Sequence, residues 1–332
     1  MTLFRTLTRS AAGIAAAVAL AATPAHAYKV SDTFEVNGKL FADWTVSAED
    51  DKNAGFHSTR NYFEVKAKVW EDDSVRITLD TKALESATGL KYAYWEHKIN
   101  GSTKTRAGLH HTPLVDYDQE KVWGHRYVEK AFTDHVGAQT SSDSGVSLMG
   151  NALDKHVDYH LSIQNGEGYG HAADGNGYAY SGRVEYTTAG IHVGAFGYVE
   201  TEHLKTAASG PTPAVFTPNR ERYLGYAYYQ ADAFEVGGQY LTANDSDATK
   251  FNDGTGYSVQ ANVNLPVGNK AVGFVRYDSM EYKDTDLDPT TLTVAGVEFA
   301  AAPGITLAPT YKNKDTGTAT ETTVAVYGQF KF

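Results

Sequence analysis

The sequence has no cysteine. Disulfide frameworks, thiolate metal sites, iron–sulfur clusters and cysteine nucleophiles are therefore excluded. Cationic residues are also few: the sequence has 29 Lys and Arg against 40 Asp and Glu, which gives a formal net charge of −11. A chain this acidic lacks the basic face that binds a phosphate backbone, so no nucleic acid partner is expected. Long apolar runs are missing beyond the N-terminus, and the mean hydropathy of −0.40 argues against a bundle of membrane helices. It does not exclude a β-barrel, whose strands alternate apolar and polar side chains.

The N-terminal segment has the organisation of a secretory signal peptide. Two Arg residues precede an apolar stretch over residues 11–22, and Ala25 and Ala27 supply a small-x-small cleavage pattern. The apolar stretch is too short to span a bilayer as a helix, although an uncleaved inner-membrane anchor is the alternative. We therefore assign residues 1–27 to a signal peptide and residues 28–332 to the mature domain.

Apolar and polar residues alternate with period two through most of the mature chain, as in residues 62–69, 157–164 and 257–265. This period indicates half-buried β-strands, and no segment shows comparable helical spacing. Sixteen candidate strands start near residues 33, 58, 74, 89, 104, 143, 155, 177, 190, 219, 233, 256, 270, 290, 304 and 319. Short turns and longer loops alternate between them, as in barrels of outer membranes. The sequence thus predicts an all-β fold, a transmembrane antiparallel up-and-down β-barrel of 16 strands.

A soluble β-sandwich would show alternation too, but three features favour the barrel. One face of the clearest strands is apolar while the other is rich in charge, and a sandwich rarely needs sixteen such strands. Aromatic residues such as Trp70, Tyr186 and Tyr277 lie near strand ends, which suits the aromatic girdles of a membrane barrel. The chain also ends in an alternating strand whose last residue is Phe332.

The third long loop, residues 113–142, is by far the longest. A long loop in a compact protein is usually either functional or disordered, and the apolar content of this one favours order. We expect Leu114, Val115, Trp123 and Phe132 to pin the loop against the inner wall while its charges narrow the pore. A surface lid or a trimer latch is the alternative. The charged residues expected at the constriction are Asp116, Asp118, Glu120, Lys121, Arg126, Glu129 and Lys130.

Three stretches resemble outer-membrane proteins of Gram-negative bacteria. The last strand, over residues 324–332, resembles the C-terminal signature read by the barrel-assembly machinery, so Phe330 and Phe332 are the expected assembly signal. Residues 112–146 and 165–169 resemble parts of porins related to the phosphate-selective class. Their matching motifs are Thr112-Pro113-Leu114-Val115-Asp116-Tyr117, Trp123-Gly124-His125-Arg126-Tyr127, Phe132-Thr133-Asp134, Ser141-Ser142-Asp143-Ser144-Gly145-Val146 and Asn165-Gly166-Glu167-Gly168-Tyr169.

The resemblance implies a passive diffusion channel that works as a homotrimer in the cell outer membrane, with the third long loop folded into the lumen. The partners it implies are outer-membrane lipid and lipopolysaccharide, the barrel-assembly machinery and small hydrophilic solutes. It implies no cofactor.

The inward face of the barrel should decide which solutes pass, because sixteen strands leave a water-filled channel. Alternation places Arg60, Lys66, Lys68, Arg76, Arg106 and Arg183 on the lumen wall. A positive strip concentrates anions, so a mild anion preference is predicted. Pairing of these cations with acids on neighbouring strands is the alternative. The acids interleaved with the cations of the long loop argue against strong phosphate selectivity.

Catalytic motifs are missing despite many His, Ser and Asp residues. The sequence has neither a Gly-x-Ser-x-Gly elbow nor a His-Glu-x-x-His pair, so no enzymatic activity is expected, and an outer-membrane hydrolase is a weaker alternative. The acidic loops lack the spacing of an EF-hand, so no metal site is predicted. A structural or adhesive barrel without conductance is the remaining alternative.

Overall fold

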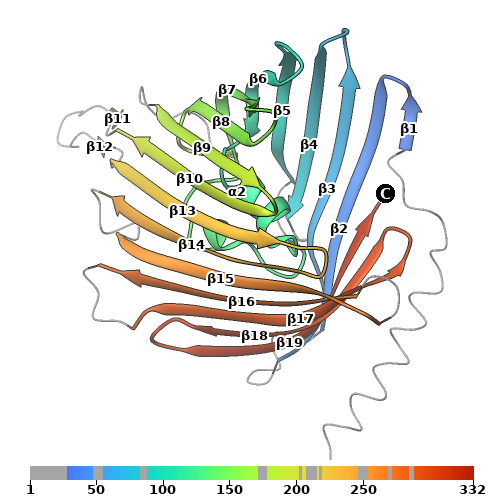
Figure 1. The fold of residues 1–332 in the computed structure, drawn as a ribbon, viewed down its shortest axis with the longest axis vertical. Coiled ribbons are helices and arrows are strands. Elements are labelled where there is room, and N and C mark those ends of the chain that lie inside the picture. The colour runs from blue at the N-terminus through green and yellow to red at the C-terminus, as the bar shows by residue number, and fades with distance from the viewer. Residues whose placement is uncertain are drawn as a thin grey trace, which may run out of the picture.

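Figure 1 shows the protein as a computed structural model. It describes residues 28–47, 55–82, 88–170, 178–201, 204–206, 215–216, 219–245, 253–267, 271–283 and 288–332. The predicted signal peptide lies outside the described residues. Within them, no helix is long and apolar enough to cross a membrane.

Sixteen antiparallel strands form one closed barrel. They are β2 (Phe34–Ser47), β3 (Gly55–Lys68), β4 (Asp73–Lys82), β5 (Thr88–Lys98), β6 (Thr103–His111), β7 (Ser142–Ala152), β8 (Val157–Gln164), β9 (Ala179–Thr188), β10 (Ile191–Glu200), β13 (Arg220–Gln230), β14 (Phe234–Asp245), β15 (Gly254–Leu265), β16 (Ala271–Tyr282), β17 (Thr290–Ala302), β18 (Ile305–Asp315) and β19 (Thr320–Lys331). Each strand pairs with the next, and β19 returns to pair with β2, so that Lys331 lies opposite Lys39. The predicted strand number, direction and topology are confirmed, and every strand starts within three residues of its predicted position.

Both ends of the described chain meet on β2. A short strand that the alternation did not predict, β1 (Tyr28–Ser31), folds back on β2 and places Tyr28 opposite Val36. Gly38 lies on β2 between the residues that pair with β1 and those that pair with β19. Its backbone exchanges two hydrogen bonds, of 2.9 and 3.1 Å, with that of Phe332. The Phe332 ring lies against Gly38, where a Cβ atom would come within 2.1 Å of it. Only glycine fits this position without moving the terminal ring.

The outward strand faces are apolar. Exposed outward side chains include Phe63, Ile77, Val146, Val184, Tyr223, Val259, Val275 and Val324. Neighbouring residues in each strand point inward and are mostly polar on β3 to β9. Because the closed sheet pairs its strands all the way round, the barrel can place this apolar surface against lipid without leaving an unpaired edge.

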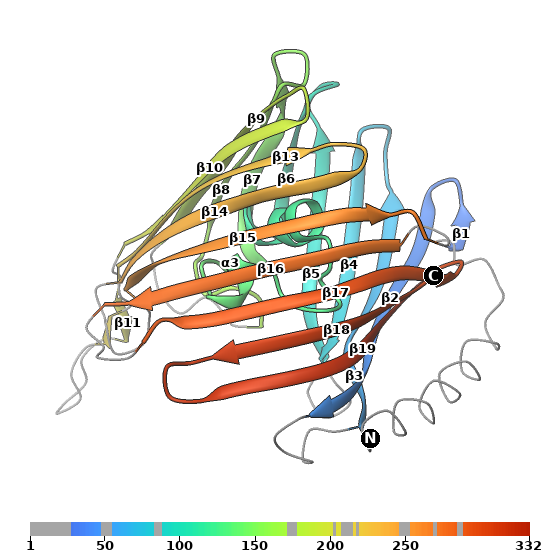
Figure 2. The same cartoon turned by 60° about the horizontal axis from the view of Figure 1, so that its bottom comes forward.

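The long loop, called L3 from here on, lies inside the ring of strands in both views (Figures 1 and 2). It contains α2 (Val115–Tyr117), the π-helical turn η2 (Asp118–Trp123) and α3 (Phe132–His135). The η2 turn ends at Gly124, whose φ of 75° lies in the left-handed region that favours glycine. A second unpredicted element is the small ribbon of β11 (Leu204–Thr206) and β12 (Val215–Phe216).

L3 packs on an apolar part of the inner wall. Trp123 joins a cluster with Phe274 and Val294, while Leu114 and Phe132 join another. That second cluster takes its wall residues from β9 to β14, among them Phe196, Leu224 and Leu241. The charge-rich inner face expected from the clearest strands is therefore replaced by an apolar wall where L3 docks. Packing L3 on this apolar wall removes both surfaces from water, which stabilises the docked loop.

Candidate functional site

A cavity of about 650 Å³ lies between L3 and the wall formed by β2 to β9. It reaches from the short-turn end of the barrel, at Lys331 and Phe332, to the start of L3 at Thr112 and Pro113. Nine cations and three acids line it. The cations are Lys39, Lys66, Arg76, Lys91, Arg106, Lys121, Arg126, Arg183 and Lys331, and the acids are Glu64, Asp116 and Glu120. The lining is thus strongly positive although the whole chain is acidic.

Four of the six basic wall residues expected from the alternation line this cavity. They are Lys66, Arg76, Arg106 and Arg183. The other two do not. Arg60 is held by Asp80, with 3.3 Å between its Nε and Oδ1 of the carboxylate. Lys68 is exposed at the last position of β3, next to a short turn.

Acids on neighbouring strands neutralise part of the basic wall. Glu64 forms ion pairs with Arg76 and with Lys66, the latter at 2.7 Å. Glu96 accepts a hydrogen bond of 2.7 Å from Nε of Arg106 and also pairs with Lys104. The alternative of cross-strand pairing is therefore present as well. Even when Glu96, Asp134 and Asp158 are counted with the three lining acids, nine cations face six acids, so pairing leaves an excess of positive charge.

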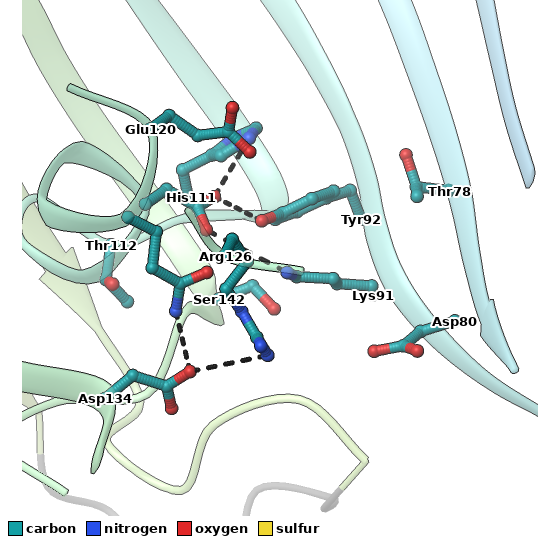
Figure 3. Close-up of polar contacts among 12 residues, drawn as sticks. Thr78, Asp80, Lys91, Tyr92, His111, Thr112, Glu120, Arg126, Asp134 and Ser142 are labelled. Carbon is teal, nitrogen blue, oxygen red and sulfur yellow. Dashed lines mark hydrogen bonds and ion pairs between the residues drawn. The ribbon is translucent and has the colours of Figure 1, made fainter. Parts of the chain in front are cut away.

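Lys91 reaches the cavity through a β-bulge. The register of β4 with β5 jumps between Thr78 opposite Tyr92 and Leu79 opposite Leu90, so Lys91 is the extra residue. Lys91 and Tyr92 consequently both point inward, toward L3, as Figure 3 shows. Only 5% of Lys91 is exposed. Strict alternation would have turned one of these two neighbours outward, which is why the sequence did not reveal Lys91.

The Asp116 carboxylate of L3 docks on this part of the wall. One oxygen lies 3.8 Å from Nζ of Lys91, and the other lies 3.2 Å from Nε2 of His111 and accepts a hydrogen bond from the Tyr92 hydroxyl. The His111 ring stacks on Tyr92 with 3.9 Å between the ring centres, and its Nδ1 lies 3.0 Å from Nη1 of Arg106. Arg106 only donates, so Nδ1 accepts from Arg106, while Nε2 lies 3.2 Å from Nη1 of Arg76 as well as from Asp116. Asp116 therefore brings L3 up to the basic wall.

Three further charges of L3 also line the cavity: Glu120, Lys121 and Arg126. Oε1 of Glu120 lies 3.2 Å from Nζ of Lys39. Burial opposes ionisation of Glu120, but the charges of Lys39 and Lys331 outweigh it and hold its pKa below the ordinary value. Nη2 of Arg126 lies 3.7 Å from Asp134, a contact drawn in Figure 3. These side chains form the L3 side of the cavity.

Asp118 does not line the cavity, contrary to expectation. It is 2% exposed and accepts a hydrogen bond of 2.6 Å from the Thr133 hydroxyl and one of 3.3 Å from Nε2 of Gln239. Burial raises its pKa, although the hydrogen bonds from Thr133 work in the opposite direction. Asp118 thus ties η2 to α3 and to β14.

Glu129 and Lys130 do not line the cavity either, and they contact β18 and β16. Glu129 pairs with Lys312 at 3.1 Å. Burial alone would raise the pKa of Glu129, but the charges of Lys312 and Arg276 overcome it and lower the pKa to about 2. The carbonyl oxygen of Lys130 accepts a hydrogen bond of 2.7 Å from Nη2 of Arg276. Both residues attach L3 to the wall.

Phe330 and Phe332, the expected assembly signal, lie where the end of β19 meets β2. Phe330 lies opposite Leu40 on β2, while the Phe332 side chain lines the cavity. Lys39 and Lys331, opposite each other, add two cations that were not predicted as site residues. Within the described part of the chain, no group of three or more His, Cys, Asp or Glu side chains could hold a metal ion.

No protein-family model matches the sequence, and no curated protein matches it. Solved structures match its fold. Salmonella typhi OmpF, in a complex with daunomycin, is 15% identical with a TM-score of 0.67 and covers 90% of this chain and 97% of its own. An anion-selective porin from Comamonas acidovorans is 12% identical with a TM-score of 0.67, covering 90% and 99%. The trimer form of Vibrio cholerae OmpT is 14% identical with a TM-score of 0.61, covering 90% and 99%.

At these identities the likeness establishes the fold alone. The chain has the closed 16-stranded barrel of outer-membrane porins. This fold, together with the apolar outward face described above, indicates a location in the outer membrane.

Proposed function

We propose that the protein is a porin, a passive diffusion channel for small hydrophilic solutes and ions, and that it prefers anions. The observation that carries the proposal is the cavity beside L3, lined by nine cations and three acids. Charges on a low-dielectric wall raise the local concentration of ions of opposite sign. Since Glu64, Asp116 and Glu120 share the same cavity, the proposal stops short of strong phosphate selectivity.

In this proposal L3 constricts the pore. Asp116, Glu120, Lys121 and Arg126 face the basic wall across the cavity, while Asp118, Glu129 and Lys130 hold the loop in place. The barrel performs no chemistry and needs no cofactor.

We further propose a homotrimer, removal of residues 1–27 after export, and contacts with lipopolysaccharide and the barrel-assembly machinery. The trimer form of Vibrio cholerae OmpT, which shares the fold, supports the first of these. Cross-linking of the purified protein tests the trimer, and N-terminal sequencing tests cleavage before Tyr28.

Planar bilayers test the channel directly. The purified, folded protein should insert with stepwise increases of current, and a KCl gradient should give a zero-current potential of the sign for anion preference. A cation-selective potential would refute the anion preference. Heat-modifiable migration in gels shows whether the purified protein is folded. If the folded protein gives no channel current, a structural or adhesive barrel would be favoured instead.

A further inference from the structure

The start of the fourth long loop folds over the end of L3. Residues 165–170, called the entrance strap from here on, directly follow β8 and include the last of the porin-like motifs. The backbone N–H of Tyr169 donates a hydrogen bond of 3.0 Å to the carbonyl oxygen of Ser142, the first residue of β7. The strap also packs closely on L3, because a Cβ atom at Gly168 would come within 2.6 Å of the Thr140 side chain.

The side chain of Tyr169 leaves the strap across the lumen. Its hydroxyl donates a hydrogen bond of 3.4 Å to Oδ2 of Asp80 on β4. β5 and β6 lie between β4 and β7, where the backbone of Tyr169 is bound. Neighbouring strands are about 4.8 Å apart, so the three steps from β7 to β4 follow about 14 Å of curved wall. The tyrosine therefore bridges a chord of the barrel.

This bridge lies at the outer end of the basic cavity. Thr78 is the last residue of β4 that lines the cavity, and Asp80 is the next inward residue toward the long loops (Figure 3). On β3 the cavity ends at Tyr62, and Arg60 is the next inward residue. Arg60 and Asp80 are the ion pair described above, and Asp80 is completely buried. Tyr169, Asp80 and Arg60 thus form a layer that covers the cavity on the side of the long loops.

The other end of the cavity is accessible. Lys66 and Lys331 line it near the short turns, and both side chains are exposed. A solute that arrives from the short-turn side can therefore reach the basic wall directly. A solute that arrives from the side of the long loops meets Tyr169 first.

We propose that Tyr169 is the entry filter of the pore, and that solutes from outside the cell reach the basic cavity only when its ring moves away from Asp80. The hydrogen bond of 3.4 Å is long and therefore weak, which suits a contact that opens. Asp80 keeps its ion pair with Arg60 when the ring leaves, so opening strands no buried charge. The inference rests on the proposed channel function and adds to it a residue that limits the size of entering solutes.

A single cysteine below the strap can test the filter, since the natural sequence has no cysteine. Lys66→Cys places a thiol at an exposed position of the cavity. The probe is a negatively charged methanethiosulfonate reagent, added to one side of a planar bilayer and, in a separate run, to the other. Each modification puts a negative charge on the wall and should lower the KCl current. The rate from one side should be much lower than the rate from the other.

Adding Tyr169→Ala should raise the slow rate at least about tenfold, because neither the hydrogen bond nor the ring then closes the entrance. The fast rate should not change, so the difference between the two sides should nearly vanish. Tyr169→Phe removes the hydroxyl and keeps the ring, and it should raise the slow rate about fivefold. This second variant also serves if Tyr169→Ala does not fold. A slow rate that neither variant changes would overturn the filter.

Tyr282→Ala is the matched control. Tyr282 is the last residue of β16 and lines a smaller cavity behind α3, outside the basic cavity. Its replacement should leave both rates unchanged, and an equal rise of the slow rate would show that the effect is not specific to the strap. A channel that conducts KCl but whose Lys66→Cys thiol reacts equally fast from both sides refutes the filter alone. A folded protein that does not conduct refutes the channel function.

Discussion

Replacing Lys91 with Gln should reduce the anion preference of the pore about eightfold. Lys91 lines the cavity, and its Nζ lies 3.8 Å from Oδ1 of Asp116. The ammonium group also lies 5.0 Å from the centre of the Tyr62 ring and 5.1 Å from that of Tyr92. The substitution removes one positive charge from the wall and leaves the Asp116 carboxylate less compensated.

The magnitude follows from Coulomb's law in a water-filled pore. Two unit charges about 7 Å apart in water interact by about 0.6 kcal/mol. An anion loses this attraction when Lys91 is neutralised, and a cation is freed from an equal repulsion. The two changes add to about 1.2 kcal/mol, which is about eightfold in the anion-to-cation permeability ratio.

The zero-current potential across a bilayer with a tenfold KCl gradient measures this ratio. The shift should be clear near 0.1 M salt and should shrink near 1 M, where the screening length falls to about 3 Å. Lys155→Gln is the control, since Lys155 carries the same charge but is exposed in a turn outside the cavity. An unchanged potential in Lys91→Gln, or an equal shift in Lys155→Gln, would refute the reasoning.

Three further predictions concern the attachment of L3 and the closure of the barrel. Trp123→Ala should weaken the docking of L3 by about 3–5 kcal/mol, because the indole is fully buried. A protease should then cut within L3 faster, while the barrel keeps its heat-modifiable migration. Unchanged resistance to the protease would contradict this. Gly38→Ala should displace the Phe332 ring, which a Cβ atom would approach to 2.1 Å, and lower the temperature at which the folded band disappears in gels. An unaltered temperature would count against it. The pair of Glu129 with Lys312 should stabilise L3 fully above pH 4.5 and lose its effect as the pH falls through about 2, since the pKa of Glu129 is lowered from 4.5 to about 2. The rate at which pepsin cleaves L3, divided by the rate in a Lys312→Met variant at the same pH, should therefore rise as the pH falls over this range. A ratio that stays constant would show that the ion pair does not stabilise L3.

The strands could be predicted because the bilayer imposes a simple rule on every one of them. Each strand must show apolar side chains to lipid, so the alternation is repeated sixteen times and small errors in one strand do not spread. The short elements lack this signal. Neither β1 nor the β11–β12 ribbon has enough residues to show a period, and neither was predicted.

The site was predicted less well, for two physical reasons. A bulge changes the direction of a side chain without changing the composition of the strand, so Lys91 was missed. Charges in a loop have no period at all, so the sequence could not tell Asp116, which meets the basic wall, from Asp118, which is buried behind it. The contact of Glu129 with Lys312 joins residues far apart in the chain and leaves no local pattern.

The pairing of β19 with β2 also has a kinetic consequence. The hydrogen bonds that close the ring join the first barrel strand to the last, so they form only after nearly the whole chain has arrived. Pairings between residues so distant in sequence form slowly. Until then both edge strands are open, and sheets with open edges are prone to pair with other chains. The unclosed barrel is therefore the most aggregation-prone state that this protein passes through, and protection during that interval should govern how much of it reaches the membrane folded.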